Sequence, residues 1–175
     1  MTTVVRRTAH ELGRSEGHTT LEQRFRFAGE GANAEAIGQL LLQAPLIGDA
    51  SVFGGRPGEE GTRTEQSRSL RGFSPAPGFR FDVDLTRRGE GEFFVRFSQP
   101  ERRAPYLQGD LLWLIADEDD GTVFDEQINT DRALKIVSEP LGGLQPSLRR
   151  WLFFRLGHKQ VMDGATRNIA TLLSR

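Results

Sequence analysis

The chain has 175 residues, a formal net charge of −1 and no cysteine. This length allows one domain with a real core. The lack of cysteine excludes disulfides, thiolate metal sites and catalytic thiols. Charge that is nearly balanced and spread along the chain argues against a nucleic-acid partner. There is no signal-peptide core and no apolar run of roughly 18 residues, so we expect no membrane span and a cytoplasmic location.

The first third of the chain predicts a tail, a strand and a helix. Residues 1–18 are polar without sustained periodicity, which favours a flexible N-terminal tail, with residues 19–175 as the domain. Thr20–Phe27 alternates as a half-buried strand does, and Asn33 is a plausible N-cap for a helix over Ala34–Gln43. Residues 46–50 favour a second short helical turn.

Further strands follow at regular intervals. Two clear alternating runs joined by a glycine-containing link predict an antiparallel hairpin, and an acidic turn at residues 117–121 joins another pair. The expected strands are Thr62–Arg71, Phe79–Thr86, Glu92–Ser98, Leu111–Ala116 and Thr122–Asp131. Apolar residues spaced at three and four then predict one long amphipathic helix over Pro146–Arg175. Strands followed by a helix indicate an α+β layer arrangement with an antiparallel sheet.

Familiar chemical motifs are missing. The three histidines have no metal-ligand spacing, and the acidic turn lacks the ligand pattern of a calcium loop. None of the glycine-rich segments has a dinucleotide or phosphate-binding pattern. The sequence therefore predicts no metal and no cofactor.

Four polar residues stand where an apolar side chain is expected. By strand parity Gln23 lies among Leu21, Phe25 and Phe27, and Glu126 lies with Phe124 and Ile128. Arg68 shares a face with Leu70, and His158 lies on the long helix. A buried carboxylate needs a partner, so an inward Glu126 predicts pairing with Arg68 or His158, or a polar cavity. Structural pairing, orientation of a ligand and acid–base catalysis are all open for these residues.

The order of elements resembles the START-like, or Bet v 1-like, helix-grip superfamily, which includes polyketide cyclases/dehydrases and lipid-transport proteins. The resemblance is carried by TLEQRFRF, NAEAIGQLLLQAPLIGDA, GFRFDVDLTRR, GEFFVRFS, LLWLIADEDDGTVFDEQINTD and the segment from Pro140 to Arg175. It implies a curved seven-stranded antiparallel sheet wrapped around the long C-terminal helix, with short helices after the first strand and a cavity in between. These are pattern-level matches, so they transfer no active-site residue.

Our leading hypothesis is a protein that binds or carries a hydrophobic small molecule, such as a lipid, polyketide or quinone-like compound, in that cavity. One alternative is an enzyme of the cyclase or dehydratase type that uses an inward carboxylate or histidine. Another is a protein-interaction module, and a homodimer is left open as well. The residues expected at the cavity are Gln23, Arg68, Phe81, Val83, Phe93, Val95, Trp113, Phe124, Glu126, Trp151, Phe154 and His158.

Overall fold

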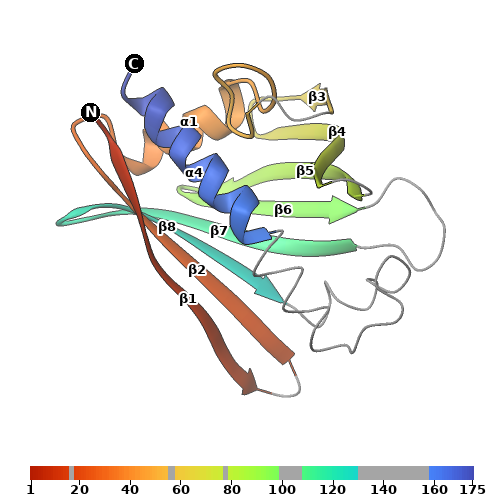
Figure 1. The fold of residues 1–175 in the computed structure, drawn as a ribbon, viewed down its shortest axis with the longest axis horizontal. Coiled ribbons are helices and arrows are strands. Elements are labelled where there is room, and N and C mark those ends of the chain that lie inside the picture. Colours follow the sequence, from red (N-terminus) through yellow and green to blue (C-terminus); the bar gives the residue numbers. More distant parts are fainter. Residues whose placement is uncertain (16–17, 55–57, 77–78, 99–107, 130–157) are drawn as a thin grey trace.

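The structure is a computed structural model that describes residues 1–15, 18–54, 58–76, 79–98, 108–129 and 158–175. Within these residues the strands form one eight-stranded antiparallel sheet in the order β1-β2-β8-β7-β6-β5-β4-β3. Within the same described residues two helices, α1 (Ala34–Gln43) and α4 (Lys159–Leu173), accompany the sheet (Figure 1). The bounds of the strands are β1 Thr3–Ser15, β2 His18–Ala28, β3 Glu59–Arg63, β4 Ser67–Ala76, β5 Phe79–Gly89, β6 Glu92–Ser98, β7 Gln108–Glu118 and β8 Gly121–Asn129.

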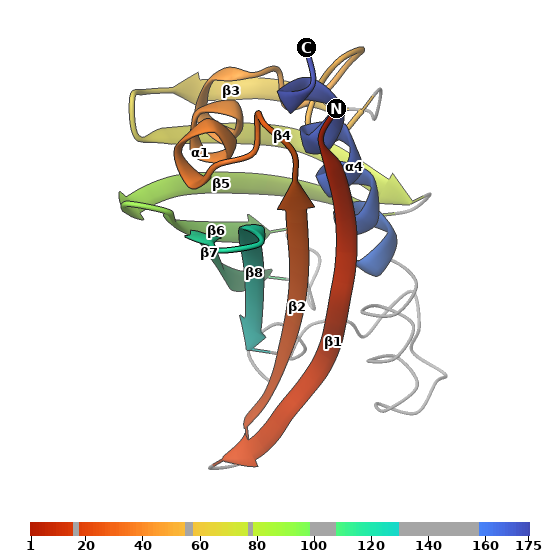
Figure 2. The ribbon, with the colours of Figure 1, turned by 90° about the vertical axis from the view of Figure 1, so that its left-hand side faces the viewer.

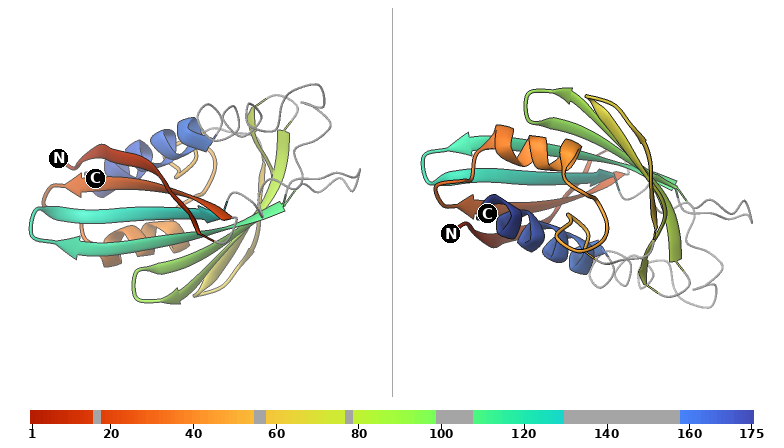
Figure 3. Two further views of the ribbon diagram at one scale, coloured as in Figure 1. Left: turned by 90° about the horizontal axis from the view of Figure 1, so that it is seen from below. Right: turned by 90° about the horizontal axis from the view of Figure 1, so that it is seen from above.

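The sheet is strongly curved. Figure 2 shows β1 and β2 running across the direction of β3 to β5, and Figure 3 shows both helices on the inner side of the curve. The predicted α+β class, the antiparallel sheet and the C-terminal helix are confirmed, and the described residues form eight strands in place of the seven expected.

The additional strand comes from the segment predicted to be a flexible tail. β1 pairs with β2 from Thr3 opposite Ala28 to Ser15 opposite His18. The prediction of a flexible tail over residues 1–18 is therefore wrong for Thr3–Ser15. An edge strand is bonded through its backbone to one neighbour and tolerates charged side chains. It can therefore form without alternating apolar and polar residues, which is the pattern that predicts a strand from a sequence.

A second correction concerns the segment predicted as one strand over Thr62–Arg71. It contains a turn between β3 and β4, where Thr64 N–H donates to the carbonyl of Ser67 (2.8 Å). The Thr64 hydroxyl oxygen accepts from the backbone N–H of Ser67 (2.9 Å), which closes the turn through a side chain. Without glycine or proline, this turn has no strong sequence signal.

Helix α1 spans Ala34–Gln43, as predicted. The side chain of Asn33 caps it by accepting from Ala36 N–H (2.8 Å), and Ile37, Leu41 and Leu42 are buried. Residues 46–50 form bends and a turn instead of the expected second helical turn. That loop is closed by the backbone N–H of Val52 bonding the carbonyl of Pro45 (2.9 Å).

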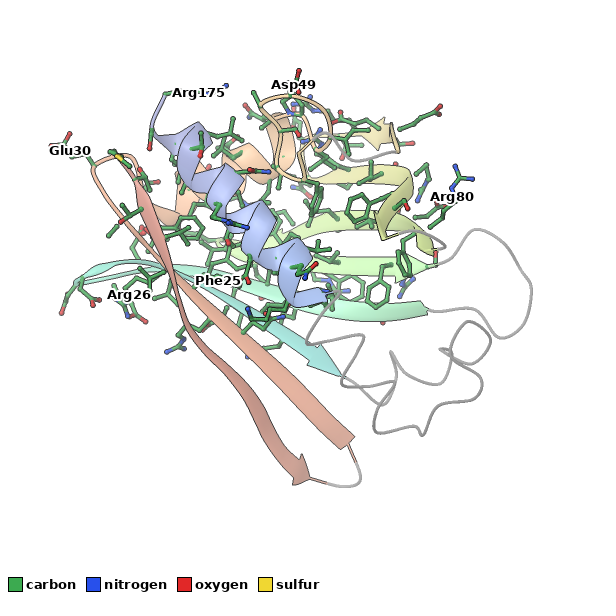
Figure 4. The ribbon with its side chains drawn as sticks, in the orientation of Figure 1. Phe25, Arg26, Glu30, Asp49, Arg80 and Arg175 are labelled. Carbon is green, nitrogen blue, oxygen red and sulfur yellow. The ribbon has the colours of Figure 1, made fainter. Side chains whose placement is uncertain are left out.

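Helix α4 spans Lys159–Leu173, inside the predicted C-terminal helix; residues 146–157 of that prediction lie outside the described residues. Its buried face carries Met162, Ala165, Thr166, Ile169 and Ala170. Apart from Thr166, these side chains join those of α1 and of the inner face of the sheet in one hydrophobic core. Figure 4 shows this core crowded between α4 and the strands, with Phe25 among its side chains.

The turn of the predicted β5–β6 hairpin needs a glycine at Gly91. Its φ of 67° favours glycine, and its carbonyl accepts from the N–H of Ile115 on the neighbouring strand (2.7 Å). A side chain there would collide with the Ile115 backbone. This close approach joins the hairpin to β7.

Candidate functional site

The candidate site is built on a row of three strands. Gln23 on β2 lies opposite Glu126 on β8, and Glu126 lies opposite Trp113 on β7. Because side chains alternate along a strand, residues in register on neighbouring strands point to the same face. All three side chains are buried, with relative exposures of 1%, 0% and 4% in that order.

The Glu126 carboxylate accepts hydrogen bonds from three sides. Gln23 Nε2 donates to Oε1 (3.0 Å), and the indole Nε1–H of Trp113 donates to Oε2 (2.8 Å). His158 Nε2 lies 2.6 Å from Oε1. These four residues, Gln23, Trp113, Glu126 and His158, are called the Glu126 cluster below.

His158 reaches the cluster from a different part of the fold. It is the residue immediately before α4, and its side chain is 14% exposed. An ionised carboxylate can only accept, so the Nε2 atom carries the hydrogen whenever Glu126 is charged. The docking of α4 on the sheet thus completes the set of donors around Glu126 and leaves the imidazole as its most exposed member.

Aromatic side chains pack beside the cluster through Trp113. Phe25 and Phe124 meet edge to face, with ring centroids 6.4 Å apart, and the Trp113 and Phe124 centroids are 5.3 Å apart. An apolar surround of this kind strengthens each electrostatic interaction inside it by lowering the local dielectric response.

Arg68 does not join the cluster. On β4 it donates through Nη1 to the carbonyls of Leu41 (3.3 Å) and Ala44, and through Nη2 to Glu60 Oε2 (2.9 Å). Burial lowers the pKa of Arg68, and the adjacent Glu60 carboxylate opposes that shift. Of the two partners predicted for an inward Glu126, the structure supplies His158 and not Arg68.

The remaining predicted cavity residues lie in the core or outside the described residues. Val83 is half-buried, and the fully buried ones are Phe81, Phe93, Val95, Trp113 and Phe124. Trp151 and Phe154 lie outside the described residues. The role of Trp113 as a hydrogen-bond donor was missed, because a tryptophan on an apolar face is indistinguishable from packing in a sequence.

The described residues line pockets on two sides of α4. One, of about 230 Å³, lies between β1, β2 and α4 and has Val4, Phe25, Asp163, Thr166 and Arg167 in its walls. The other, of about 220 Å³, lies between the loop after α1 and the C-terminal end of α4. Of these two pockets, only the first has a wall formed by β2, the strand that carries Gln23.

Within the described ranges no group of three or more histidine, cysteine or acidic residues is arranged to hold a metal ion. The helices that the structure describes are also too short or too polar to cross a membrane.

Comparison with known proteins identifies the architecture. No family model matches the chain, and no curated protein matches it. Among solved structures, protein Ms6760 from Mycobacterium smegmatis is 13% identical with a TM-score of 0.59, and the match covers 97% of both chains. A protein from Rhodobacter sphaeroides is 12% identical with a TM-score of 0.54, covering 98% of this chain and 99% of that one.

The third match is the di-domain ARO/CYC protein StfQ from the steffimycin biosynthetic pathway, 12% identical with a TM-score of 0.53. It covers 89% of this chain and 50% of StfQ. The chain has a helix-grip fold. The helix-grip architecture expected from the order of elements is thereby confirmed, and at identities this low the similarity extends to the fold alone.

Proposed function

We propose that this helix-grip protein binds a small hydrophobic molecule on the inner face of its sheet, at the N-terminal end of α4. The observation that carries the proposal is the Glu126 cluster: one fully buried carboxylate within an apolar surround, with a partly exposed imidazole beside it. Ligand sites in proteins commonly combine a mainly apolar lining with a few convergent polar groups. The similarity in fold to the ARO/CYC protein StfQ is consistent with a ligand of this kind.

In this proposal the two parts of the site have different tasks. Apolar side chains provide most of the affinity, at about 25 cal/mol for each Å² of ligand surface removed from water. The polar cluster orients the molecule, since leaving a buried polar group unmatched is costly. Arg68 has no part in the proposed site, because its guanidinium already donates to the carbonyl of Leu41 at the end of α1 and to Glu60.

Native mass spectrometry and fluorescence titration with Nile red, a neutral apolar dye, test the proposal. We expect a small molecule to co-purify with the protein or the dye to bind saturably at one site. Glu126→Leu should weaken dye binding, whereas Asp125→Asn, the next residue on the opposite face of β8, should not. Absence of both a co-purifying molecule and saturable dye binding would refute the proposal.

A second candidate function is supported by the contact between His158 and Glu126. A carboxylate that orients an imidazole is a common arrangement for acid–base catalysis, and the 2.6 Å contact has that geometry. In such a reaction the proton of the bound molecule would move to or from His158 Nδ1, because Nε2 faces Glu126. Against this, Arg68, a buried cation that could stabilise an enolate-like charge, lies away from the cluster and bonds Glu60.

Deuterium exchange separates the two candidates. An acid–base site should accelerate exchange of the acidic C–H of the probe 2-tetralone in D₂O, followed by NMR, and His158→Gln should abolish the acceleration. A binding protein should leave the exchange at the rate of the buffer alone.

A further inference from the structure

The orientation of the Gln23 amide is determined by its neighbour. Its nitrogen donates to Glu126 Oε1 at 3.0 Å. An ionised carboxylate oxygen can accept a hydrogen bond but not donate one, so the amide nitrogen has to face Glu126. The amide oxygen, Gln23 Oε1, is consequently turned away from the carboxylate.

This oxygen is buried and has no hydrogen-bond partner among the described residues. Gln23 as a whole is 1% exposed, so solvent does not satisfy the acceptor. A buried acceptor without a donor costs about 1–3 kcal/mol, and most buried polar atoms in folded proteins are paired. Gln23 Oε1 therefore needs a donor that the described part of the chain does not provide.

The polarity of the surroundings restricts what that donor can be. The indole N–H of Trp113 and the amide of Gln23 are both directed at Glu126, which carries the negative charge of the cluster. An approaching carboxylate would meet this charge in an apolar environment, where repulsion is strong. The oxygen of a ketone or ether can only accept hydrogen bonds, so it cannot satisfy Gln23 Oε1, which is itself an acceptor.

There is also space on the same side of the sheet. Phe25, two residues along β2 and on the same face as Gln23, forms part of the wall of the pocket of about 230 Å³ beneath α4. Phe25 itself is 1% exposed, so its ring provides an apolar surface on the face of β2 that carries Gln23.

We propose that the molecule bound by this protein is neutral and carries a hydroxyl group that donates a hydrogen bond to Gln23 Oε1. This inference rests on the proposed binding function and names the class of ligand. Alcohols and phenols are favoured, while acids and molecules with only acceptor groups are disfavoured.

Four naphthalenes of similar size test the proposal by isothermal titration or by Trp fluorescence: 2-naphthol, naphthalene, 2-methoxynaphthalene and 2-naphthoate. We expect 2-naphthol to bind roughly fivefold to tenfold tighter than naphthalene, the size of one net hydrogen bond. The methyl ether should bind no better than naphthalene, and 2-naphthoate should be the weakest of the four.

The variant Gln23→Leu should remove the preference, so that 2-naphthol and naphthalene both bind and have about equal affinity. Gln127→Leu, on the opposite face of β8, is the matched control and should keep the preference. If Gln23→Leu does not fold, Gln23→Met and the probe series on the unaltered protein provide the same comparison.

The outcomes separate the two proposals. Equal affinity for 2-naphthol and naphthalene in the unaltered protein, or a preference that survives loss of the Gln23 amide, overturns the hydroxyl assignment and leaves ligand binding intact. Failure of all three neutral probes to bind, together with the absence of Nile red binding, overturns the binding function itself.

Discussion

The sheet buries two charges of opposite sign, Arg68 on β4 and Glu126 on β8, with relative exposures of 3% and 0%. Arg68 faces a carboxylate and two backbone carbonyls at the end of α1. Glu126 faces a neutral amide, an indole N–H and a histidine. The first charge is matched by an opposite charge within the protein, whereas two of the three groups that face the second are the neutral dipoles of Gln23 and Trp113.

This difference separates a structural site from a candidate binding site. A cation at the carboxyl end of a helix interacts favourably with the helix dipole and satisfies the last carbonyls. Through Glu60, which also accepts from the backbone N–H of Leu46, Arg68 ties α1 and the following loop to the edge of the sheet. The Glu126 cluster instead has a partly exposed histidine and an amide oxygen, Gln23 Oε1, for which the described part of the chain supplies no donor.

The largest effect is expected from Arg68→Leu. It leaves the Leu41 and Ala44 carbonyls without their donor and Glu60 without its cation, so the free energy of unfolding should fall by about 3–5 kcal/mol in a urea titration. Arg71→Leu is the control, since Arg71 is an exposed arginine on the same strand that pairs with Asp84, and should change stability by less than about 1 kcal/mol. Similar losses for the two variants would show that burial of Arg68 is unimportant.

Glu126→Leu should have a somewhat smaller effect. Gln23 and Trp113 would each lose the acceptor of a buried donor, at a cost of about 2–3 kcal/mol in the same titration. Asp125→Asn, which weakens only the pair with the half-exposed Arg24, should cost less than about 1 kcal/mol. A neutral or stabilising Glu126→Leu would mean that an apolar residue is preferred there and that the charge is retained for function.

His158→Gln sharpens the contrast between the two sites. His158 is partly exposed, and Glu126 keeps two other donors, so we expect a loss of about 1 kcal/mol or less. Binding of Nile red should nevertheless weaken, because the partly exposed member of the cluster is removed. A loss as large as that of Arg68→Leu would place His158 among the structural residues.

The smallest effect is expected from an exposed ion pair at the other end of α1. A hydrogen bond from Arg87 (2.7 Å), followed by one from Gln39, lowers the pKa of Glu35 below its usual 4.5. A depressed folded-state pKa contributes stability above the unfolded value and loses it as pH falls through the folded value. The stability advantage over Glu35→Gln should therefore be a few tenths of a kcal/mol at pH 7, about the size of other exposed pairs, and should shrink as the pH falls below 4.5. An advantage that grows as pH falls would contradict this sign.

Much of the candidate site could be predicted from local patterns. Strand parity placed Gln23 and Glu126 on apolar faces, and both are buried. The same parity could not show that they face each other, since 103 residues separate them in the chain. For the same reason the two alternatives for the partner of Glu126, Arg68 and His158, could not be separated from spacing.

The sequence by itself determined the faces of the strands, the extent and cap of α1, and the β5–β6 and β7–β8 hairpins, because each depends on residues close together in the chain. The tertiary structure decided that residues 3–15 form an edge strand. It also decided that Arg68 donates to carbonyls at the end of α1 and that Glu126 contacts His158. Those outcomes depend on strand order and helix docking, which bring together groups that no local pattern relates.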